Sequence, residues 1–369
     1  NPKNKEITVE SGITLAELLN FTLQHNLWIP QLPGYPSITL GGVVATNAHG
    51  KSCAIHGTIR NSIKNILLYH KNNGWLNLSK NENSEIFDLT IGGLGLTGSI
   101  VNITLNLSKL DSEYFSTRKN YVKSLNQCVE FVKRKSEIKN SYIYSWNRAD
   151  SLENLGKGII FENIPNNEKT KKIQPIPKKK SLYFFKPFFP IWNKLSIKIA
   201  NELFISFNKK FYTNKNETFT KVIFPFYGKE SYFYFFGKKG FLESQLLIPD
   251  NKIEEFFDEF KFQFKKYKPV ITLLSFKNMS GEQKFLRFED NKICITIDYT
   301  NSKKNRDFMR KIDSICIKLS ILPSVIKDSR LERSTFDNCY HYANDFRNKL
   351  RSFDKNRIYQ SETSKRLGL

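Results

Sequence analysis

Two glycine-rich segments, residues 41–51 and 92–98, limit what this chain can fold into more than any other feature. The first reads GGVVATNAHGK and the second contains GGLGLTG. Because glycine has no Cβ, such backbones let N–H groups approach a phosphate or a flat ring closely. The second segment lacks the strand-then-helix context of a dinucleotide fingerprint and the Gly-Lys-Ser/Thr of a P-loop. Each segment alone also fits an ordinary loop, but the pair favours a ligand site.

The pattern around both segments predicts a small α+β domain. It indicates a strand at 5–10, an amphipathic helix from about residue 15, a hairpin over 61–79 that turns at Asn-Asn-Gly, and a strand at 100–107. Residues 38–40 read as a further short strand before the double glycine. A compact helix or turn of small residues is expected to follow that strand.

Near residue 111 the pattern changes to aromatic-rich strands and helices. The predicted strands lie within 141–151, 219–226, 240–249, 270–277 and 292–300, and the predicted helices within 126–135, 251–267 and 301–319. Residues 165–185 are rich in Pro and Lys and read as an exposed loop. An aromatic, helix-like piece over 185–204 follows that loop.

The chain is strongly basic, with a net charge of +23 from 58 Lys and Arg against 35 Asp and Glu. Such a charge attracts polyanions: nucleic acid, anionic membranes or phosphorylated ligands. The codon usage of an AT-rich genome, which enriches Lys, Asn, Ile and Phe, explains the excess equally well. No nucleic-acid motif is recognisable, so we expect no nucleic-acid partner, and a basic nucleic-acid-binding protein is the alternative from another class. Five cysteines without CxxC spacing argue against a disulfide framework and against a metal site.

Three basic side chains stand out as candidates for chemistry. His49 and Lys51 project where the first glycine-rich segment ends, and Lys327 lies in the segment VIKDSR beside Asp328 and Arg330. A lysine flanked by a neutralising Asp can act as a positioned cation against a flavin or an alkoxide. A solvated loop and a surface charge cluster are the simpler interpretations of these two segments.

Six segments, taken in order, carry a resemblance to a known family. They are PGYPSITLGGVVATNAHGKS, NSIKNILLYH, IFDLTIGGLGLTGSI, GFLESQLLIP, VIKDSR and the terminal SKRLGL. Together they resemble the decaprenylphosphoryl-β-D-ribose 2′-oxidase family of the vanillyl-alcohol-oxidase-like FAD-linked oxidases. The likeness runs from about residue 6 to the end and weakens over 111–220.

The resemblance implies an α+β fold of two domains and non-covalently bound FAD. Residues 1–110 would form the FAD-binding domain of the PCMH type. Residues 111–320 would form an inserted substrate or cap domain, an antiparallel sheet with helices, and residues 321–369 would return to the first domain. In the family a subdomain with a glycine-rich turn for the FAD pyrophosphate precedes the strand EITVE, so that part of the FAD domain is expected to be missing here.

The resemblance also assigns residues. Those implied to contact FAD are Gly34, Thr39, Gly41, Gly42, Ala45, His49, Gly50, Gly57, Asn61, Gly93, Gly98, Ile100 and Lys327. Those implied to contact the substrate are Lys51, Trp146, Gln245, Lys277, Cys294, Thr296 and Lys327. Lys327, His49 and Lys51 are the implied catalytic residues.

Several positions depart from the family pattern. Ser52, Cys53 and Ala54 stand where the family usually carries two His after HGK-Asn, and Ile223 or Phe224 replaces a pocket Tyr. The position of a pocket Cys or Ser falls on Thr296, while Cys294 lies on the same strand face. These departures bear on the sugar more than on the flavin.

The implied reaction is oxidation of a CH–OH group, as in decaprenylphospho-β-D-ribofuranose 2-dehydrogenases. Hydride would pass from a sugar carbinol to flavin N5, with the 2′-hydroxyl of polyprenylphosphoryl-ribose as the expected site, a step toward an arabinan precursor of the cell wall. Lys327 would stabilise charge, Lys51 would bind a phosphate or the flavin edge, and His49 would accept a proton or orient the flavin. An aldonolactone or alditol oxidase, similar to D-arabinono-1,4-lactone oxidase, and a truncated inactive homologue are the alternatives.

The implied partners and location follow from that substrate. They are a lipid-linked phospho-sugar, a separate NAD(P)H-dependent short-chain reductase, and contact with an anionic membrane through the basic loop at 169–180. No apolar run of about 18 residues is present, so we expect a cytoplasmic protein or one peripheral at the inner membrane. The chain begins Asn-Pro without Met, which leaves a leader segment open.

Overall fold

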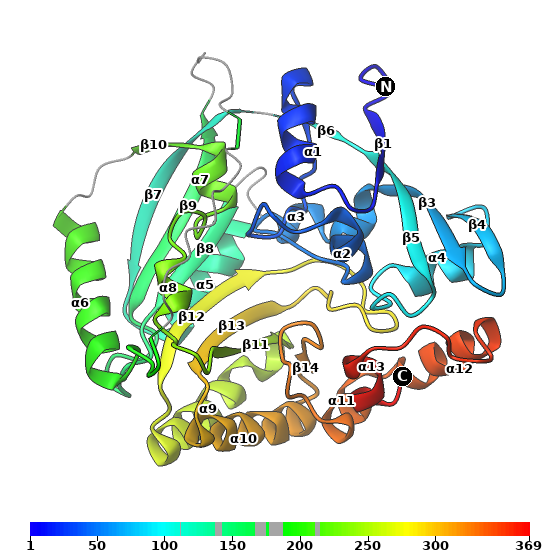
Figure 1. The fold of residues 1–369 in the computed structure, drawn as a ribbon. Coiled ribbons are helices and arrows are strands. Elements are labelled where there is room, and N and C mark those ends of the chain that lie inside the picture. The colour runs from blue at the N-terminus through cyan, green and yellow to red at the C-terminus, as the bar shows by residue number, and fades with distance from the viewer. Residues whose placement is uncertain (111, 137–141, 167–174, 177–186, 211–214) are drawn as a thin grey trace.

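A computed structural model describes residues 1–110, 112–136, 142–166, 175–176, 187–210 and 215–369 (Figure 1). The predicted α+β architecture is confirmed. A smaller sheet is formed by N-terminal strands, and a larger antiparallel sheet is formed by strands that follow later in the sequence. The loop predicted at 165–185, and with it the basic stretch at 169–180, lies almost wholly outside the described residues.

The smaller sheet and its helices are built from the N-terminal part of the chain. Its strands, in spatial order, are β1 (Glu6–Glu10), β5 (Ser99–Asn106), β3 (Ile63–His70) and β4 (Gly74–Ser79), and every pair is antiparallel. The predicted helix is α1 (Leu15–Thr22), which begins at a capping box between Thr14 and Glu17 and buries Leu15, Leu18 and Leu19. The other elements here are η1 (Leu23–His25), β2 (Leu27–Trp28), α2 (Leu40–Ala45), α3 (Cys53–His56), η2 (Ile59–Ser62), α4 (Ser84–Thr90) and β6 (Ser108–Lys109).

The larger sheet carries the second domain. Its strand order is β10 (Lys215–Thr218), β7 (Tyr114–Val122), β9 (Gly158–Asn166), β8 (Tyr142–Asn147), β12 (Ile271–Asn278), β13 (Ile293–Thr300), β11 (Phe241–Ile248) and β14 (Leu322–Pro323). Its helices are α5 (Leu125–Ser136), α6 (Lys194–Lys210), α7 (Phe219–Ile223), α8 (Ser231–Tyr234), η3 (Asp250–Lys252), α9 (Ile253–Tyr267) and α10 (Lys303–Leu319). Phenylalanines of α9 and α10 pack in one buried cluster with Ile295, Ile297 and Tyr299 of β13. One face of the sheet therefore belongs to the core, and the strand period of two leaves the alternate residues for the other face.

Two predicted short strands are not strands in the structure. At residues 38–40, Thr39 is instead the N-cap of α2, and its hydroxyl accepts a hydrogen bond from the Gly42 N–H at 3.4 Å. At residues 219–226 the chain forms α7, because Phe219, Val222 and Ile223 follow a helical spacing that buries all three on one side. Short apolar runs of this kind fit either structure until packing decides.

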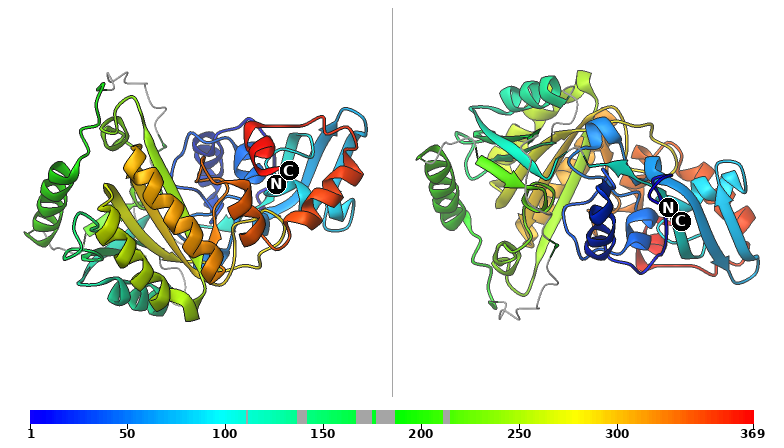
Figure 2. Two further views of the ribbon diagram at one scale, coloured as in Figure 1. Left: turned by 90° about the horizontal axis from the view of Figure 1, so that it is seen from below. Right: turned by 90° about the horizontal axis from the view of Figure 1, so that it is seen from above.

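The C-terminal segment returns to the first domain. It contains α11 (Arg333–Cys339), α12 (Ala343–Phe353) and α13 (Glu362–Leu367), and Figure 2 shows these helices beside the smaller sheet and at the opposite edge of the molecule from α6. Lys349 of α12 forms an ion pair with Glu85 of α4, and the Asn73 side chain donates to the Phe353 carbonyl at 3.2 Å. These contacts support the predicted return of residues 321–369, whose boundaries stay a prediction.

Among the described residues, none of the helices combines the length and the hydropathy that crossing a bilayer requires.

Candidate active site

The two glycine-rich segments lie against each other. The Gly92 N–H donates to the Val44 carbonyl at 3.0 Å, and the Leu94 N–H donates to the Ala45 carbonyl at 2.9 Å. The C-terminal end of α2 is therefore fixed to the second glycine-rich turn. The sequence predicted that both segments form one site, and the structure brings them together.

Some of the glycines have a packing reason of their own. A Cβ on Gly93 would lie 1.9 Å from the Leu89 carbonyl oxygen, and a Cβ on Gly98 would lie 2.6 Å from the Tyr69 carbonyl oxygen. Gly98 also has a φ of +136°, which side-chain-bearing residues rarely adopt. Beside it, Ile100 of β5 is half-buried and pairs with Leu68 of β3. The close approach of the turn to β3 thus requires glycine whether or not a cofactor contacts it.

The polar face of the larger sheet presents most of the predicted substrate residues. In the antiparallel register, Gln245 of β11 lies opposite Thr296 of β13, and Lys277 of β12 lies opposite Cys294. Residues two apart on a strand share a face, so all four side chains belong to the same side of the sheet. Gln245 is buried, and its Oε1 has no hydrogen-bond partner among the described residues.

Basic groups from separate elements converge on this face. Burial, followed by the charges of Lys277 and Lys327, lowers the pKa of His49 well below its usual value. Burial and the charge of Lys277 lower the pKa of Lys51 to about 7. The Lys51 ammonium group donates to the Ile223 carbonyl at 2.5 Å and lies 5.4 Å from the ring centre of Tyr144. The charge of Lys277 thus acts on both His49 and Lys51, and that of Lys327 acts on His49, so basic residues from three predicted segments come together here.

The acidic partner of Lys327 differs from the predicted one. Lys327 Nζ lies 3.4 Å from Glu243 Oε2, whereas Asp328, the expected neutralising residue, is buried and pairs with Arg330 at 2.8 Å. Arg330 also forms two hydrogen bonds with Asp313 of α10, at 2.6 and 2.8 Å. The Asp and Arg of VIKDSR therefore anchor the loop, and Glu243 shares the charge of Lys327.

Sequence reasoning missed two carboxyl groups at this site. Glu243 accepts a hydrogen bond from the Gln245 amide at 3.0 Å and lies opposite Asp298 in the β11–β13 register. Asp298 accepts from the Tyr232 hydroxyl at 2.9 Å, and burial together with the Glu243 charge raises its pKa well above the usual value. The alternation of side chains along a strand could have indicated them. Glu243 is two residues from Gln245, and Asp298 is two residues from Thr296, so each carboxyl group belongs to the same sheet face as a predicted substrate residue.

Two other predicted residues have contacts outside the basic group. Trp146 packs against Phe204 of α6 and against Tyr232, and its indole N–H donates to Asn201 at 3.1 Å. Asn61 lines a cavity of about 330 Å³ whose other lining residues include none of the basic cluster, and its amide N lies close to Gly57.

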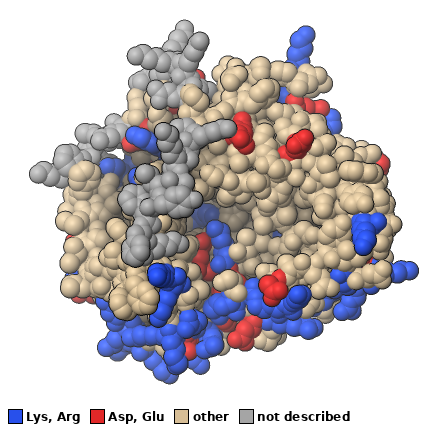
Figure 3. All heavy atoms as spheres, viewed as in Figure 1, with Lys and Arg blue, Asp and Glu red and all other residues tan. Residues whose placement is uncertain are grey.

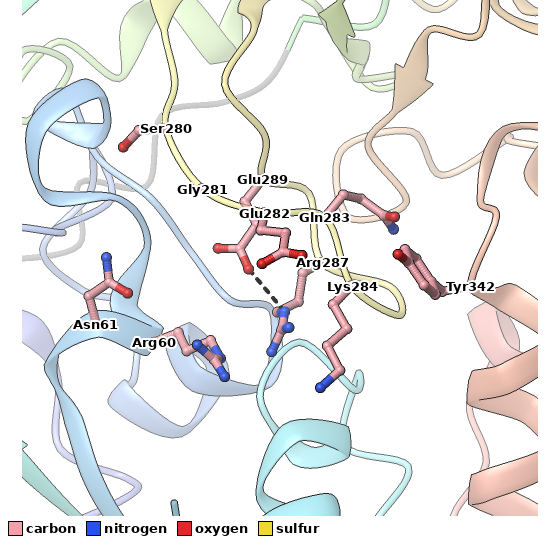
Figure 4. Close-up of a pocket in the computed structure, with 10 residues that line it drawn as sticks. All are labelled: Arg60, Asn61, Ser280, Gly281, Glu282, Gln283, Lys284, Arg287, Glu289 and Tyr342. Carbon is pink, nitrogen blue, oxygen red and sulfur yellow. Dashed lines mark ion pairs between the residues drawn. The ribbon is translucent and has the colours of Figure 1, made fainter.

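The cavity lined by Asn61 lies between the first domain and the loop at 280–289 (Figure 4). Asp88 is the shared partner of three cations there: Arg60 at 2.7 Å, Lys284 at 2.6 Å and Arg287 at 3.4 Å. Burial alone would raise the pKa of the Asp88 carboxyl. The hydrogen bonds from Arg60 and Lys284 and the charges of Arg60 and Arg287 outweigh burial and lower this pKa to about 2. Asp88 already neutralises part of the charge of these cations. We therefore interpret the cavity as a structural contact between domains and not as a ligand site.

The converging residues fit a flat anionic cofactor. Gly34 has no atom within 4 Å of the place where a Cβ would stand, and Gly41 and Gly42 are half-buried on α2. Neighbouring cations that depress one another's pKa are relieved by a negative charge, such as that of a reduced flavin or a phosphate. The face drawn in Figure 3 is hollowed near its centre, with basic and acidic side chains visible inside the hollow.

Comparison with known proteins agrees with this fit. A family profile described as "FAD binding domain" matches residues 1–79. Decaprenylphosphoryl-beta-D-ribose oxidase of Mycolicibacterium smegmatis is 26% identical to the chain over 98% of the chain and 81% of its own length. L-gulonolactone oxidase of Mus musculus is 25% identical over 45% of the chain and 36% of its own length. L-galactono-1,4-lactone dehydrogenase 2, mitochondrial, of Oryza sativa subsp. japonica is 28% identical over 44% of the chain and 23% of its own length. FAD is therefore the cofactor, and the residue roles stay predictions.

Proposed function

We propose that this chain, which belongs to the FAD-linked oxidases, oxidises a secondary hydroxyl of a sugar that is linked through phosphate to a lipid. The observation that supports this proposal best is the meeting of His49, Lys51, Lys277 and Lys327 at the polar face of the larger sheet. The three lysines of this group suit both a phosphorylated substrate and a flavin that becomes negative on reduction. The likeness to decaprenylphosphoryl-beta-D-ribose oxidase spans nearly the whole chain and favours the 2′-hydroxyl of a polyprenylphosphoryl ribose as the reacting group.

FAD, when bound, supplies the hydride acceptor, and the side chains of this chain supply the rest. The hydroxyl proton of the sugar passes to the Glu243 carboxylate, and the C–H hydrogen leaves as hydride, so a ketone remains. Lys327, 3.4 Å from that carboxylate, stabilises the alkoxide as it forms. Gln245, with its buried and unpartnered Oε1, accepts a hydrogen bond from a second sugar hydroxyl.

Lys51 and His49 have positioning roles in this scheme. Lys51 is half-buried beside Tyr144, where its charge binds the substrate phosphate. A phosphate raises the pKa of Lys51 again and so holds the lysine in its charged form. His49, whose pKa is lowered by burial and by two lysines, is neutral near pH 7 and orients the flavin by a hydrogen bond.

Oxidation of a free aldonolactone or alditol is the second candidate function. The partial likeness to L-gulonolactone oxidase and to L-galactono-1,4-lactone dehydrogenase favours it. Such substrates carry no phosphate, so that reaction leaves the charge of Lys51 without a partner. If the phospho-sugar reaction is the right one, a separate NAD(P)H-dependent reductase would consume the keto product.

The test is a panel of substrates offered to the purified, FAD-loaded chain, with products identified by mass spectrometry. We expect a prenylphosphoryl ribose to yield a product two hydrogens lighter, while the free lactones, alditols and the dephosphorylated ribose analogue stay unchanged. Lys51→Met should raise the KM for the phosphorylated substrate by about tenfold or more, the loss of one charge-assisted contact. Faster turnover of a free lactone than of the phosphorylated sugar would favour the second candidate instead.

A further inference from the structure

Helix α6 covers the outer edge of the second domain and packs there through one face only (Figures 1 and 2). Ile197, Asn201 and Asn208, at spacings of four and seven residues, are buried. Asn201 joins Trp146 to Asp150, with hydrogen bonds of 3.1 and 2.9 Å. The inner face of α6 is therefore held by specific polar contacts, and the helix is a fixed part of the domain.

The outer face of α6 is apolar along its whole length. Leu195, Ile199, Leu203 and Phe207 follow at four-residue intervals and are 67%, 51%, 66% and 65% exposed. Phe188 and Phe189, just before the helix, are 64% and 75% exposed. A helix of 17 residues is about 25 Å long, so these side chains form a stripe of that length. Exposed apolar stripes of this size mark surfaces that become covered.

Lysines flank the stripe, and its single acid is already paired. Lys194, Lys198 and Lys209 are exposed on α6, whereas Glu202, the one acidic residue of the helix, forms an ion pair with Arg148 at 2.7 Å. Burial and the charges of Lys304 and Lys268 lower the pKa of Lys194, which places three lysines together at the start of the helix. Lys238 lies 5.1 Å from the ring centre of Phe188. In Figure 3, Lys and Arg gather along the lower edge, where the start of α6 and helices α9 and α10 lie in Figure 1.

We propose that the outer face of α6, from Phe188 to Phe207, docks on the surface of an anionic lipid bilayer. An amphipathic helix with lysines beside its apolar stripe lies in the plane of such a membrane, with the apolar side chains among the lipid chains and the lysines at the headgroups. A second copy of the chain fits poorly, because the clustered lysines and the net charge of +23 repel an identical surface. This inference goes beyond the proposed function and needs no bound flavin.

The docking surface is connected to the candidate active site. Phe204 on the inner face of α6 contacts Trp146, and Trp146 contacts Tyr232, whose hydroxyl donates to Asp298. Between a bilayer on the outer face of α6 and the polar face of the larger sheet thus lie the helix itself and three aromatic side chains in contact.

The test is co-sedimentation of the full chain with phosphatidylglycerol vesicles and with phosphatidylcholine vesicles. We expect binding to the anionic vesicles that weakens as salt is added. Phe207→Ser should lower the partition coefficient by about tenfold or more, and Lys198→Gln by about fivefold at low salt. The matched control is Phe262→Ser on α9, since Phe262 is 63% exposed and Phe207 is 65% exposed.

The circular dichroism spectrum of each variant should match that of the wild type, which shows that lost vesicle binding is not caused by misfolding. The proposal fails if the wild type ignores both kinds of vesicle or if Phe207→Ser binds as well as Phe262→Ser. It also fails if sedimentation velocity shows a dimer that Phe207→Ser dissociates, because the stripe then serves a second copy. Since the assay involves no turnover, a failed substrate panel would leave this result untouched.

Discussion

Lys327 reaches the polar face of the larger sheet from a loop that a buried ion-pair network holds in place. Asp328, Arg330 and Asp313 form that network, and the Ser324 N–H fixes the same loop to the Gln245 carbonyl at 2.8 Å. The ammonium group therefore has a defined position beside Glu243, which is what stabilisation of a developing charge requires.

Replacing Lys327 tests this role. Lys327→Ala should lower the rate of flavin reduction by the substrate by about 10²–10³-fold while FAD stays bound. Stopped-flow absorbance under anaerobic conditions measures the rate, and the flavin content of the purified variant measures binding. Lys303→Ala on α10, whose side chain is 87% exposed, is the control and should behave as wild type. Near-wild-type reduction in the Lys327 variant would remove this residue from the catalytic set.

Lys51 makes the stability of the chain depend on pH. In the folded chain its pKa is about 7, against an ordinary value of 10.5, because burial and Lys277 disfavour the charged form. The unfolded chain therefore binds more protons between these two values, and the contribution of Lys51 to stability rises with pH across that window. We expect Lys51→Met to raise the melting temperature by a few degrees near pH 7 and by less near pH 10. A pH-independent difference between variant and wild type would contradict the lowered pKa of Lys51.

Motif spacing in the sequence predicted the cationic residues of the site but not its acids. His49, Lys51 and Lys327 stand in short segments with unusual composition, which makes them visible without a structure. Glu243 lies in an ordinary strand, and its importance depends on which strand becomes its neighbour. That pairing is a long-range choice, and the sequence alone predicts it poorly.

At the scale of elements, the loop at 280–289 holds the turn that carries His49. The buried Glu289 accepts hydrogen bonds from Asn47 at 3.1 Å and from Thr58 at 2.6 Å, and Arg287 Nε lies 2.9 Å from its other oxygen. Asn47 and Thr58 belong to the first domain, and Thr58 forms a β-bridge with His49. One carboxylate thus connects the two domains at the candidate active site.

Removing that carboxylate should weaken the whole structure. Glu289→Ala leaves Asn47 and Thr58, both buried, without their acceptor and leaves buried Arg287 with Asp88 as its remaining acidic partner, which costs about 3–5 kcal/mol. Urea unfolding measures this change. Glu282→Ala, an exposed neighbour on the same loop, is the control and should shift stability by less than about 0.5 kcal/mol. If the two variants unfolded at the same urea concentration, Glu289 would not stabilise the contact between the domains.

Element types were predictable where the apolar pattern is long. Helices α9 and α10, with 15 and 17 residues, repeat the helical period several times and match their predictions closely. Residues 38–40 and 219–226 were predicted as strands wrongly because each run is too short to separate the two periods. At the first site Thr39 acts as the N-cap of helix α2, and at the second the burial of Phe219 favours helix α7.

At the scale of the whole molecule, two domains meet around a polar face. The α+β class agrees with the resemblance seen in the sequence, and the division into domains stays a prediction. The strand order of the larger sheet could not be predicted, since strands β7 and β9 pair across 36 residues or more and β14 joins the far edge. Lys277 reaches the other basic side chains of the site from β12, near the middle of that order.

Hydride transfer from a phospho-sugar to FAD at the polar face of the larger sheet is the central step of the proposed function. The most direct measurement is single-turnover reduction of the FAD-loaded chain by a prenylphosphoryl ribose, with hydrogen or deuterium at the 2′ carbon, under anaerobic conditions. We predict that the absorbance band of oxidised flavin disappears and that deuterium slows this loss several-fold. Flavin that stays oxidised in the presence of the phospho-sugar, or reduction at equal rates with both isotopes and in the Lys327→Ala variant, would contradict the account.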